Sequence, residues 1–145
     1  MTKLFVDANV LIDISVTNRP SSEDSLIFYQ FLLENNSKFE LFTSCDLLTT
    51  IYYILRRQLN KADALNKIKI INRIFFVIEF GNKEIDEAIE LMERNKKYTD
   101  LEDTIQYVMA RKEKCDYIIT NDKAFTSGDV PVLSSGEALV EFIQR

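Results

Sequence analysis

Short strand-like runs alternate with longer helical segments along this chain, and this alternation most constrains its fold. Apolar, β-branched and aromatic residues predict strands at residues 3–6, 39–43, 74–80, 116–120 and 130–133. Apolar residues at helical spacing predict helices over residues 22–35, 44–59, 61–73, around 85–92, from 100 onward, and 136–144. Strands that alternate with helices predict an α/β fold with a mostly parallel sheet covered on both faces.

Composition fits one compact domain over residues 1–145. Hydrophobic residues make up 46% of the 145 residues, enough for a single core, and there are only 3 Gly and 2 Pro. No apolar run approaches the ~20 residues that a membrane-spanning helix needs. The first residues lack a long apolar signal core, so we expect a cytoplasmic protein. Cys45 and Cys115 show no metal-ligand spacing and are expected to be reduced, buried thiols.

The chain contains no histidine, which narrows the chemistry it can perform. Serine and cysteine hydrolase sites that depend on imidazole are excluded, as are the usual zinc hydrolase sites. Carboxylates, Lys, Tyr, Thr or a hard metal ion remain. The net charge of −5 by itself disfavours a nucleic-acid partner. That argument is weak, because a nuclease built on carboxylate-bound cations carries local negative charge in any case.

Aspartates follow two of the predicted strands. Asp7 comes directly after residues 3–6, and Asp122 comes directly after residues 116–120. Ligand sites of parallel sheets lie beyond the carboxyl ends of the strands, so both residues are candidates for a site. Each alone has an equally good structural explanation: Asp7 as a helix cap, and Asp122 as a turn residue.

A further group of acids opens the helix that precedes residues 116–120. Acids in a first turn complement the helix dipole, and Asp100 can cap the helix. Asp100 and Asp103 are three residues apart and share one helix face, whereas Glu102 points roughly 140° away from that pair. The helix geometry therefore favours Asp103, together with Asp100, as the residues that this helix contributes to a site, in preference to Glu102.

Together these acids predict a shared site. Asp7, Asp103 and Asp122 could converge at one crevice, where their carboxylates would repel one another and require a cation or a proton. Ligands that are all oxygen suit Mg²⁺ or Mn²⁺ better than zinc. Such a site can activate water and stabilise phosphate oxygens, which is the chemistry of phosphodiester hydrolysis.

At these positions the sequence resembles the PIN domain family, which includes the VapC-type ribonuclease toxins. The resemblance rests on residues 5–13, 100–106, 116–122 and 131–134, which occur in the family's order over nearly the whole chain. It implies a three-layer α/β/α fold with strand order 3-2-1-4-5 and metal-dependent cleavage of RNA. Asp7, Asp103 and Asp122 would then be ligands of Mg²⁺ or Mn²⁺, with Asp100 in support. An antitoxin partner and a homodimer are also implied.

One position departs from the family pattern. The family usually has a glutamate on the helix after the second strand, about six residues past a Ser, and Thr50 stands there in this chain. Asp46 lies four residues earlier on the same helix face and could substitute. The alternative for Asp46 is an ordinary first-turn acid.

Basic and aromatic residues are candidates for RNA contact. The favoured interpretation of each basic group is a solvated helix end, and core packing is favoured for at least two of the tyrosines. The candidates are Arg56, Arg57 and Lys61; Arg94, Lys96 and Lys97; Arg111, Lys112 and Lys114; and the tyrosines Tyr52, Tyr53 and Tyr107.

Three functions remain open at this stage. The first is a metal-dependent endoribonuclease, as the toxin of a toxin–antitoxin pair. The second is a PIN-fold RNA- or protein-binding module that has lost catalysis, which Thr50 favours. The third is a phosphoacceptor of the receiver type, which expects two adjacent acids near the start and a lysine after the last strand. The sequence shows neither of those receiver features.

Overall fold

The computed structural model describes residues 1–143, and within that range five strands form one parallel sheet. The strands lie in the order β3-β2-β1-β4-β5, and every neighbouring pair is parallel. This confirms the predicted strand order. The strands are β1 (Thr2–Val6), β2 (Phe39–Ser44), β3 (Phe76–Ile78), β4 (Tyr117–Ile119) and β5 (Val132–Leu133).

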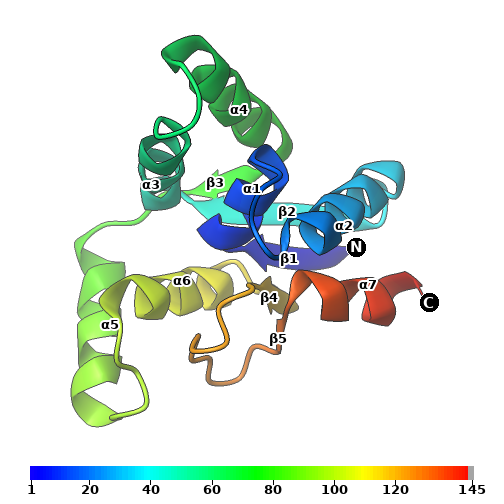
Figure 1. Ribbon diagram of the computed structural model, residues 1–145. Coiled ribbons are helices and arrows are strands. Elements are labelled where there is room, and N and C mark those ends of the chain that lie inside the picture. The colour runs from blue at the N-terminus through cyan, green and yellow to red at the C-terminus, as the bar shows by residue number, and fades with distance from the viewer. Residues whose placement is uncertain (144–145) are drawn as a thin grey trace.

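Helices cover both faces of the sheet (Figure 1). In that view the strands run from β3 at the top to β5 at the bottom, α3 and α4 lie at the top near β3, and α5, α6 and α7 lie lower, at the level of β4 and β5. Helix α1 packs against α2 and α3, α2 packs against α7, and α5 packs against α6. The helices are α1 (Ala8–Ser15), α2 (Ser22–Glu34), α3 (Cys45–Leu55), α4 (Lys61–Ile74), α5 (Asn82–Arg94), α6 (Leu101–Lys112) and α7 (Ser135–Ile143).

Strands β1 and β4 form the centre of the core and place the polar residues that follow them. Leu4, Phe5, Ile118 and Ile119 are completely buried, as expected for strands covered on both faces. The chain builds β2 and β3 on one side of β1, then crosses over to add β4 on the other side. The order of strands therefore reverses between β1 and β4, where parallel sheets form ligand sites.

Several predicted boundaries differ from the structure. Helix α3 ends at Leu55 instead of 59, because residues 57 and 58 bond to carbonyls three residues back and tighten the chain into a turn. Strand β3 is shorter than predicted because α4 extends to Ile74, and because its partner β2 ends at Ser44 opposite Ile78. The last helix begins at Ser135, and the predicted end at Gln144 lies outside the described residues.

No helix within residues 1–143 combines the length and the apolar character that crossing a membrane requires.

Candidate metal centre at the carboxyl ends of β1 and β4

Asp7 leaves the end of β1 and caps α1. Its Oδ1 accepts a hydrogen bond from the backbone N–H of Ala8 at 2.6 Å. Its Oδ2 accepts from Asn9 Nδ2 and from Thr120 Oγ1, both at 2.9 Å. Only 5% of the residue is exposed, and this burial raises the pKa of the Asp7 carboxyl against the lowering effect of its hydrogen bonds. Asp7 is therefore a helix cap and also a buried acid at the end of the sheet.

Thr120 brings Asp122 to the same place. The backbone N–H of Asp122 donates to Thr120 Oγ1 at 3.1 Å, and the same hydroxyl donates to Asp7. The Asp122 carboxylate accepts from the backbone N–H of Ala124 at 2.9 Å, which is ordinary turn geometry. A single threonine at the end of β4 thus connects the two aspartates that follow β1 and β4.

Helix α6 brings Asp103 to these two carboxylates. Asp100 caps the helix, and its Oδ1 accepts from the backbone N–H of Asp103 at 3.0 Å. Burial, followed by the negative charges of Asp100, Asp7 and Asp122, raises the pKa of Asp103 to about 7. The three acids predicted to meet therefore lie within electrostatic reach of one another at one end of the sheet.

Glu102 also lies near this group. Burial is the largest cause of the raised pKa of its carboxyl, and the negative charges of Asp46, Asp7 and Asp100 raise this pKa further. The helix geometry relates only residues of α6 to one another. In the structure, Asp46 of α3 and Asp7, which follows β1, also lie within electrostatic reach of Glu102. The preference for Asp103 and Asp100 stays a prediction, and Glu102 joins the acids that surround the site.

Asp46 and Thr50 lie on α3 at the edge of the same region. Ser44 Oγ donates to Asp46 Oδ1 at 2.6 Å, which fixes the carboxylate at the start of α3. The Thr50 hydroxyl lies 3.5 Å from the Asp46 carbonyl oxygen, so it turns back toward its own helix. Asp46 is near enough to Glu102 to raise the pKa of that carboxyl. Asp46, one helical turn before Thr50, thus places a carboxylate of α3 within electrostatic reach of the acids at the site.

The chemistry of these side chains fits a hard divalent cation. Every candidate ligand is a carboxylate, and the acids destabilise one another's charged forms, a repulsion that a bound cation would relieve. Within residues 1–143, no three carboxylate or thiol side chains already stand close enough together to enclose one ion. Binding would therefore require rotation of the less constrained acids on α6 toward Asp7, which its three hydrogen bonds hold in place.

Sequence reasoning missed the polar network behind the site. Asp13 on α1 is 3% exposed, and its carboxylate accepts from Arg19 Nε at 2.6 Å, Ser25 Oγ at 3.2 Å and Asn121 Nδ2 at 2.9 Å. Asn121 also donates its backbone N–H to Asn9 Oδ1 at 2.9 Å. These partners are up to 112 residues apart along the chain, so no local spacing signals them.

Gln106 was also missed as a site residue, although it stands in a segment that carries the family resemblance. It is completely buried on α6 near Asp7, and its proximity helps to lower the pKa of the Asp7 carboxyl. The signal that could have found it is an amide at a position where the helix turns inward, three residues after Asp103.

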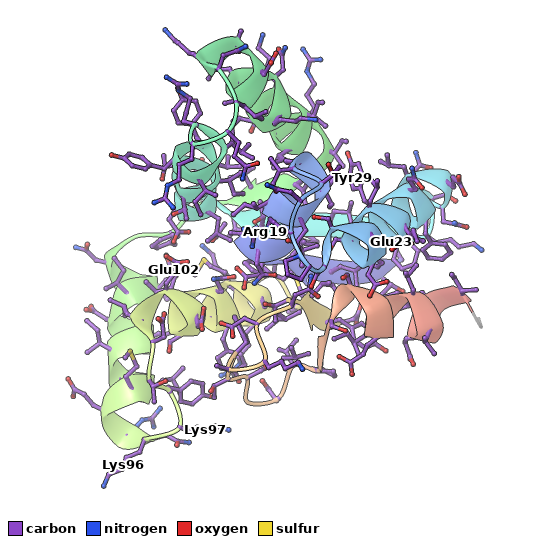
Figure 2. All side chains as sticks on the ribbon, viewed as in Figure 1. Arg19, Glu23, Tyr29, Lys96, Lys97 and Glu102 are labelled. Carbon is purple, nitrogen blue, oxygen red and sulfur yellow. The ribbon has the colours of Figure 1, made fainter. Side chains whose placement is uncertain are left out.

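The basic residues differ in their surroundings. Lys96 and Lys97 lie far from Arg19 and Glu102 in Figure 2, although they are close to Asp100 in sequence. Ion pairs occupy three cations of the second and third groups: Arg94 with Glu90, Arg111 with Asp129, and Lys112 with Glu84.

The α3 group is more open to solvent. Tyr52, Tyr53, Arg56 and Arg57 line a hollow of about 340 Å³, and Tyr53 is 76% exposed. By contrast, Tyr107 is buried and donates its hydroxyl to Asp129 at 2.6 Å. Tyr107 is therefore a core residue in this structure.

Comparison with known proteins decides the family. A model of the PIN domain matches residues 3–124. Ribonuclease VapC1 of Aquifex aeolicus is 47% identical over 135 residues, which cover 93% of this chain and 92% of that protein. This chain belongs to the PIN domain family. The receiver-type alternative is thereby set aside.

Solved structures share the PIN fold of this chain. Mycobacterium tuberculosis VapC20, a sarcin-ricin loop cleaving toxin, superposes with a TM-score of 0.68 at 16% identity, over 84% of this chain and 92% of that one. VapBC2 of Rickettsia felis, bound to a DNA fragment from its promoter, gives 0.68 at 17% identity, over 92% of this chain and 98% of that one. At these identities the likeness concerns the fold.

Proposed function

We propose that this PIN domain, spanning residues 1–145, is a Mg²⁺- or Mn²⁺-dependent endoribonuclease that hydrolyses RNA phosphodiesters. We further propose that it is the toxin of a toxin–antitoxin pair and acts in the cytoplasm as a homodimer. The observation that carries the proposal is the group of mutually repelling carboxylates where β1, β4 and α6 meet. A group of this kind needs positive charge, and an RNA phosphate is best hydrolysed where a cation is held beside it.

Each acid has a proposed role. Asp7, Asp103 and Asp122 would hold the cation, and Asp100 would support Asp103 through the start of α6. When bound, the cation supplies an activated water and offsets charge on the scissile phosphate. Thr120 would keep Asp7 and Asp122 in register, because its hydroxyl contacts both residues.

The relatives support the substrate and the partner. The 47% identical relative is named a ribonuclease, and VapC20 is described as a toxin that cleaves the sarcin-ricin loop. The Rickettsia felis structure is of VapBC2 bound to promoter DNA. We infer an RNA substrate from the first two, and a protein antitoxin from the third.

RNA cleavage by purified protein tests this proposal. Wild type should cut a single-stranded RNA in the presence of Mn²⁺ or Mg²⁺, and EDTA should stop the cleavage. The cleavage rates of Asp7→Asn and Asp103→Asn should each be at least about 100-fold lower. Asp86→Asn, on the exposed face of α5, is the matched control and should cut normally. Equal cutting by wild type and Asp7→Asn would contradict the assignment of the site.

A second candidate function is a PIN-fold RNA- or protein-binding module without catalysis. Thr50 favours it, because a carboxylate usual in the family is absent at this position. Wild-type protein that binds RNA but neither cuts it nor binds Mn²⁺ would establish this alternative. The position of Asp46 next to Glu102 argues for the enzyme, since it keeps a carboxylate on α3 at the site.

A further inference from the structure

Gln106 is a buried amide whose polar atoms have no partner inside the described part of the protein. Its side chain is completely buried, and neither Nε2 nor Oε1 makes a hydrogen bond within residues 1–143. Burying an amide without partners is costly, and native proteins rarely do so without a reason. Three buried residues close to Gln106 on α6, Ile105, Val108 and Met109, are apolar, so an apolar side chain would have suited this part of the helix.

The amide faces the carboxylate site. Its side chain lies beside the Asp7 carboxylate, without meeting the distance and angle limits of a hydrogen bond to it. Gln106 is also one helical turn after Asp103, on the same face of α6. Gln106 therefore lies near Asp7 and on the face of α6 that carries Asp103.

The hydrogen bonds of Asp7 leave little room for a direct partner. A carboxylate offers about four lone-pair sites, and three of those on Asp7 are taken by Ala8, Asn9 and Thr120. A cation would take the fourth. The Gln106 amide must then find its partners on what the site binds, where it can donate through Nε2 and accept through Oε1.

We propose that Gln106 is a positioning residue of this site, whose amide hydrogen-bonds the water shell of the divalent cation held by Asp7 and Asp103. This rests on the function proposed above and adds a neutral group to its charged ligands. The amide oxygen accepts from a cation-bound water, which restrains both that water and the cation beside Asp7. Groups that contact a metal site from outside its ligands typically change metal affinity about 10- to 100-fold when they are removed.

Calorimetric titration with Mn²⁺ and thermal unfolding in EDTA test the proposal together. Gln106→Met keeps the length of the side chain and removes its polar atoms, and Gln106→Leu is a second apolar variant. Met109→Leu, in the apolar part of the same helix, is the matched control. We expect both Gln106 variants to bind Mn²⁺ about tenfold more weakly than wild type. In EDTA, Gln106→Met should unfold at the wild-type temperature or above it, because the amide had no internal partner to lose.

The two proposals fail in different ways. If wild type binds Mn²⁺ and Gln106→Met binds it equally well, the positioning role is overturned while the proposed function stands. If wild type binds no Mn²⁺, the cation-dependent function is overturned, and the role of Gln106 falls with it. If both Gln106 variants unfold well below wild type in EDTA, the amide has partners within the protein and its role is structural.

Discussion

Asp7 and Asp13 are two buried carboxylates, one capping the first helix and one in its last turn, and they are stabilised in opposite ways. Asp13 has a cation of its own, because Arg19 Nε lies 2.6 Å from its Oδ1. Asp7 accepts only neutral hydrogen bonds and shares its surroundings with Asp103 and Asp122, which are also acidic. Burial alone therefore does not distinguish these two acids, whereas the ion pair that Asp13 makes with Arg19 does.

Asp13 and Asp7 therefore have different roles at the two ends of α1. The Asp13 network joins α1 to α2 through Ser25 and to the turn after β4 through Asn121. It holds in place the elements that carry Asp7 and Asp122. Asp7, Asp103 and Asp122, by contrast, carry negative charge that a bound cation could balance.

The largest expected effect is on stability, with opposite signs for the two residues. Asp13→Asn leaves Arg19 without its carboxylate and should lower the free energy of unfolding by about 3 kcal/mol. Asp7→Asn should raise stability in metal-free buffer, because it relieves repulsion and removes a buried charge. Urea unfolding in EDTA measures both, with Asp86→Asn as the exposed control. An Asp7→Asn protein that is less stable than wild type would show that Asp7 is chiefly a helix cap.

The pH dependence of stability should sharpen the comparison. The ordinary pKa of Asp103 is 3.8, and the folded protein holds that proton to about pH 7. Over this interval the folded state binds more protons than the unfolded state, so metal-free stability should fall as pH rises from about 4 to about 7. Asp103→Asn should reduce that slope, leaving the part that comes from the raised pKa values of Asp7 and Glu102, and urea unfolding in EDTA across this range measures it. An unchanged slope in Asp103→Asn would place the responsible proton elsewhere.

Thr50 offers a more moderate test. Thr50→Glu restores the carboxylate usual in the family, and should tighten Mn²⁺ binding while lowering stability in metal-free buffer, since it adds both a ligand and repulsion. Wild type should need more Mn²⁺ than this variant. Calorimetric titration of wild type, Thr50→Glu and Asp46→Asn separates the possibilities. No gain from Thr50→Glu together with a large loss from Asp46→Asn would mean that Asp46 already serves in its place.

The smallest expected effect concerns the exposed end of α3, which carries candidates for RNA contact. Tyr53 continues the helix face of Asp46 and Thr50 away from the acids, and Arg57 follows one turn later. Tyr53→Ala should weaken binding of a single-stranded RNA about fivefold through lost stacking, and Arg57→Ala should weaken it similarly. Fluorescence anisotropy in Ca²⁺ measures this, with Lys96→Ala as the distant control. A change of oligomeric state in Tyr53→Ala, with RNA affinity preserved, would assign this surface to contact between copies of the chain.

The sequence predicts some parts of this molecule better than others. Asp7 and Asp122 could be placed together because each directly follows an apolar strand, and parallel strands end at one edge of a sheet. The partners of Asp13 could not be predicted, because Arg19 lies in a loop and Asn121 is 108 residues away. For Gln106 the sequence offers only an amide at an inward-facing helix position, and its complete burial without a hydrogen-bond partner is visible only in the structure.

Helix-by-helix reasoning also has a limit at the start of α6. It ranks Asp103 above Glu102 by comparing directions on one helix. In the structure Asp46 of α3 and Asp7, which follows β1, lie within electrostatic reach of Glu102, and this depends on how three elements pack. The end of α3 was also predicted wrongly, because the turn at residues 57 and 58 contains no Gly or Pro that would mark it in the sequence.

Thermal unfolding with and without Mn²⁺ tests most directly whether the Asp7 group lacks the countercharge that Asp13 already has. A cation that binds only the folded protein stabilises it by about 2.7 kcal/mol at 100 times its dissociation constant, which corresponds to a rise of several degrees. The account predicts this rise for wild type near neutral pH, a much smaller one for Asp7→Asn, and the full rise for Asp86→Asn. An unfolding temperature of wild type that Mn²⁺ leaves unchanged, or an equal rise in Asp7→Asn, would contradict it.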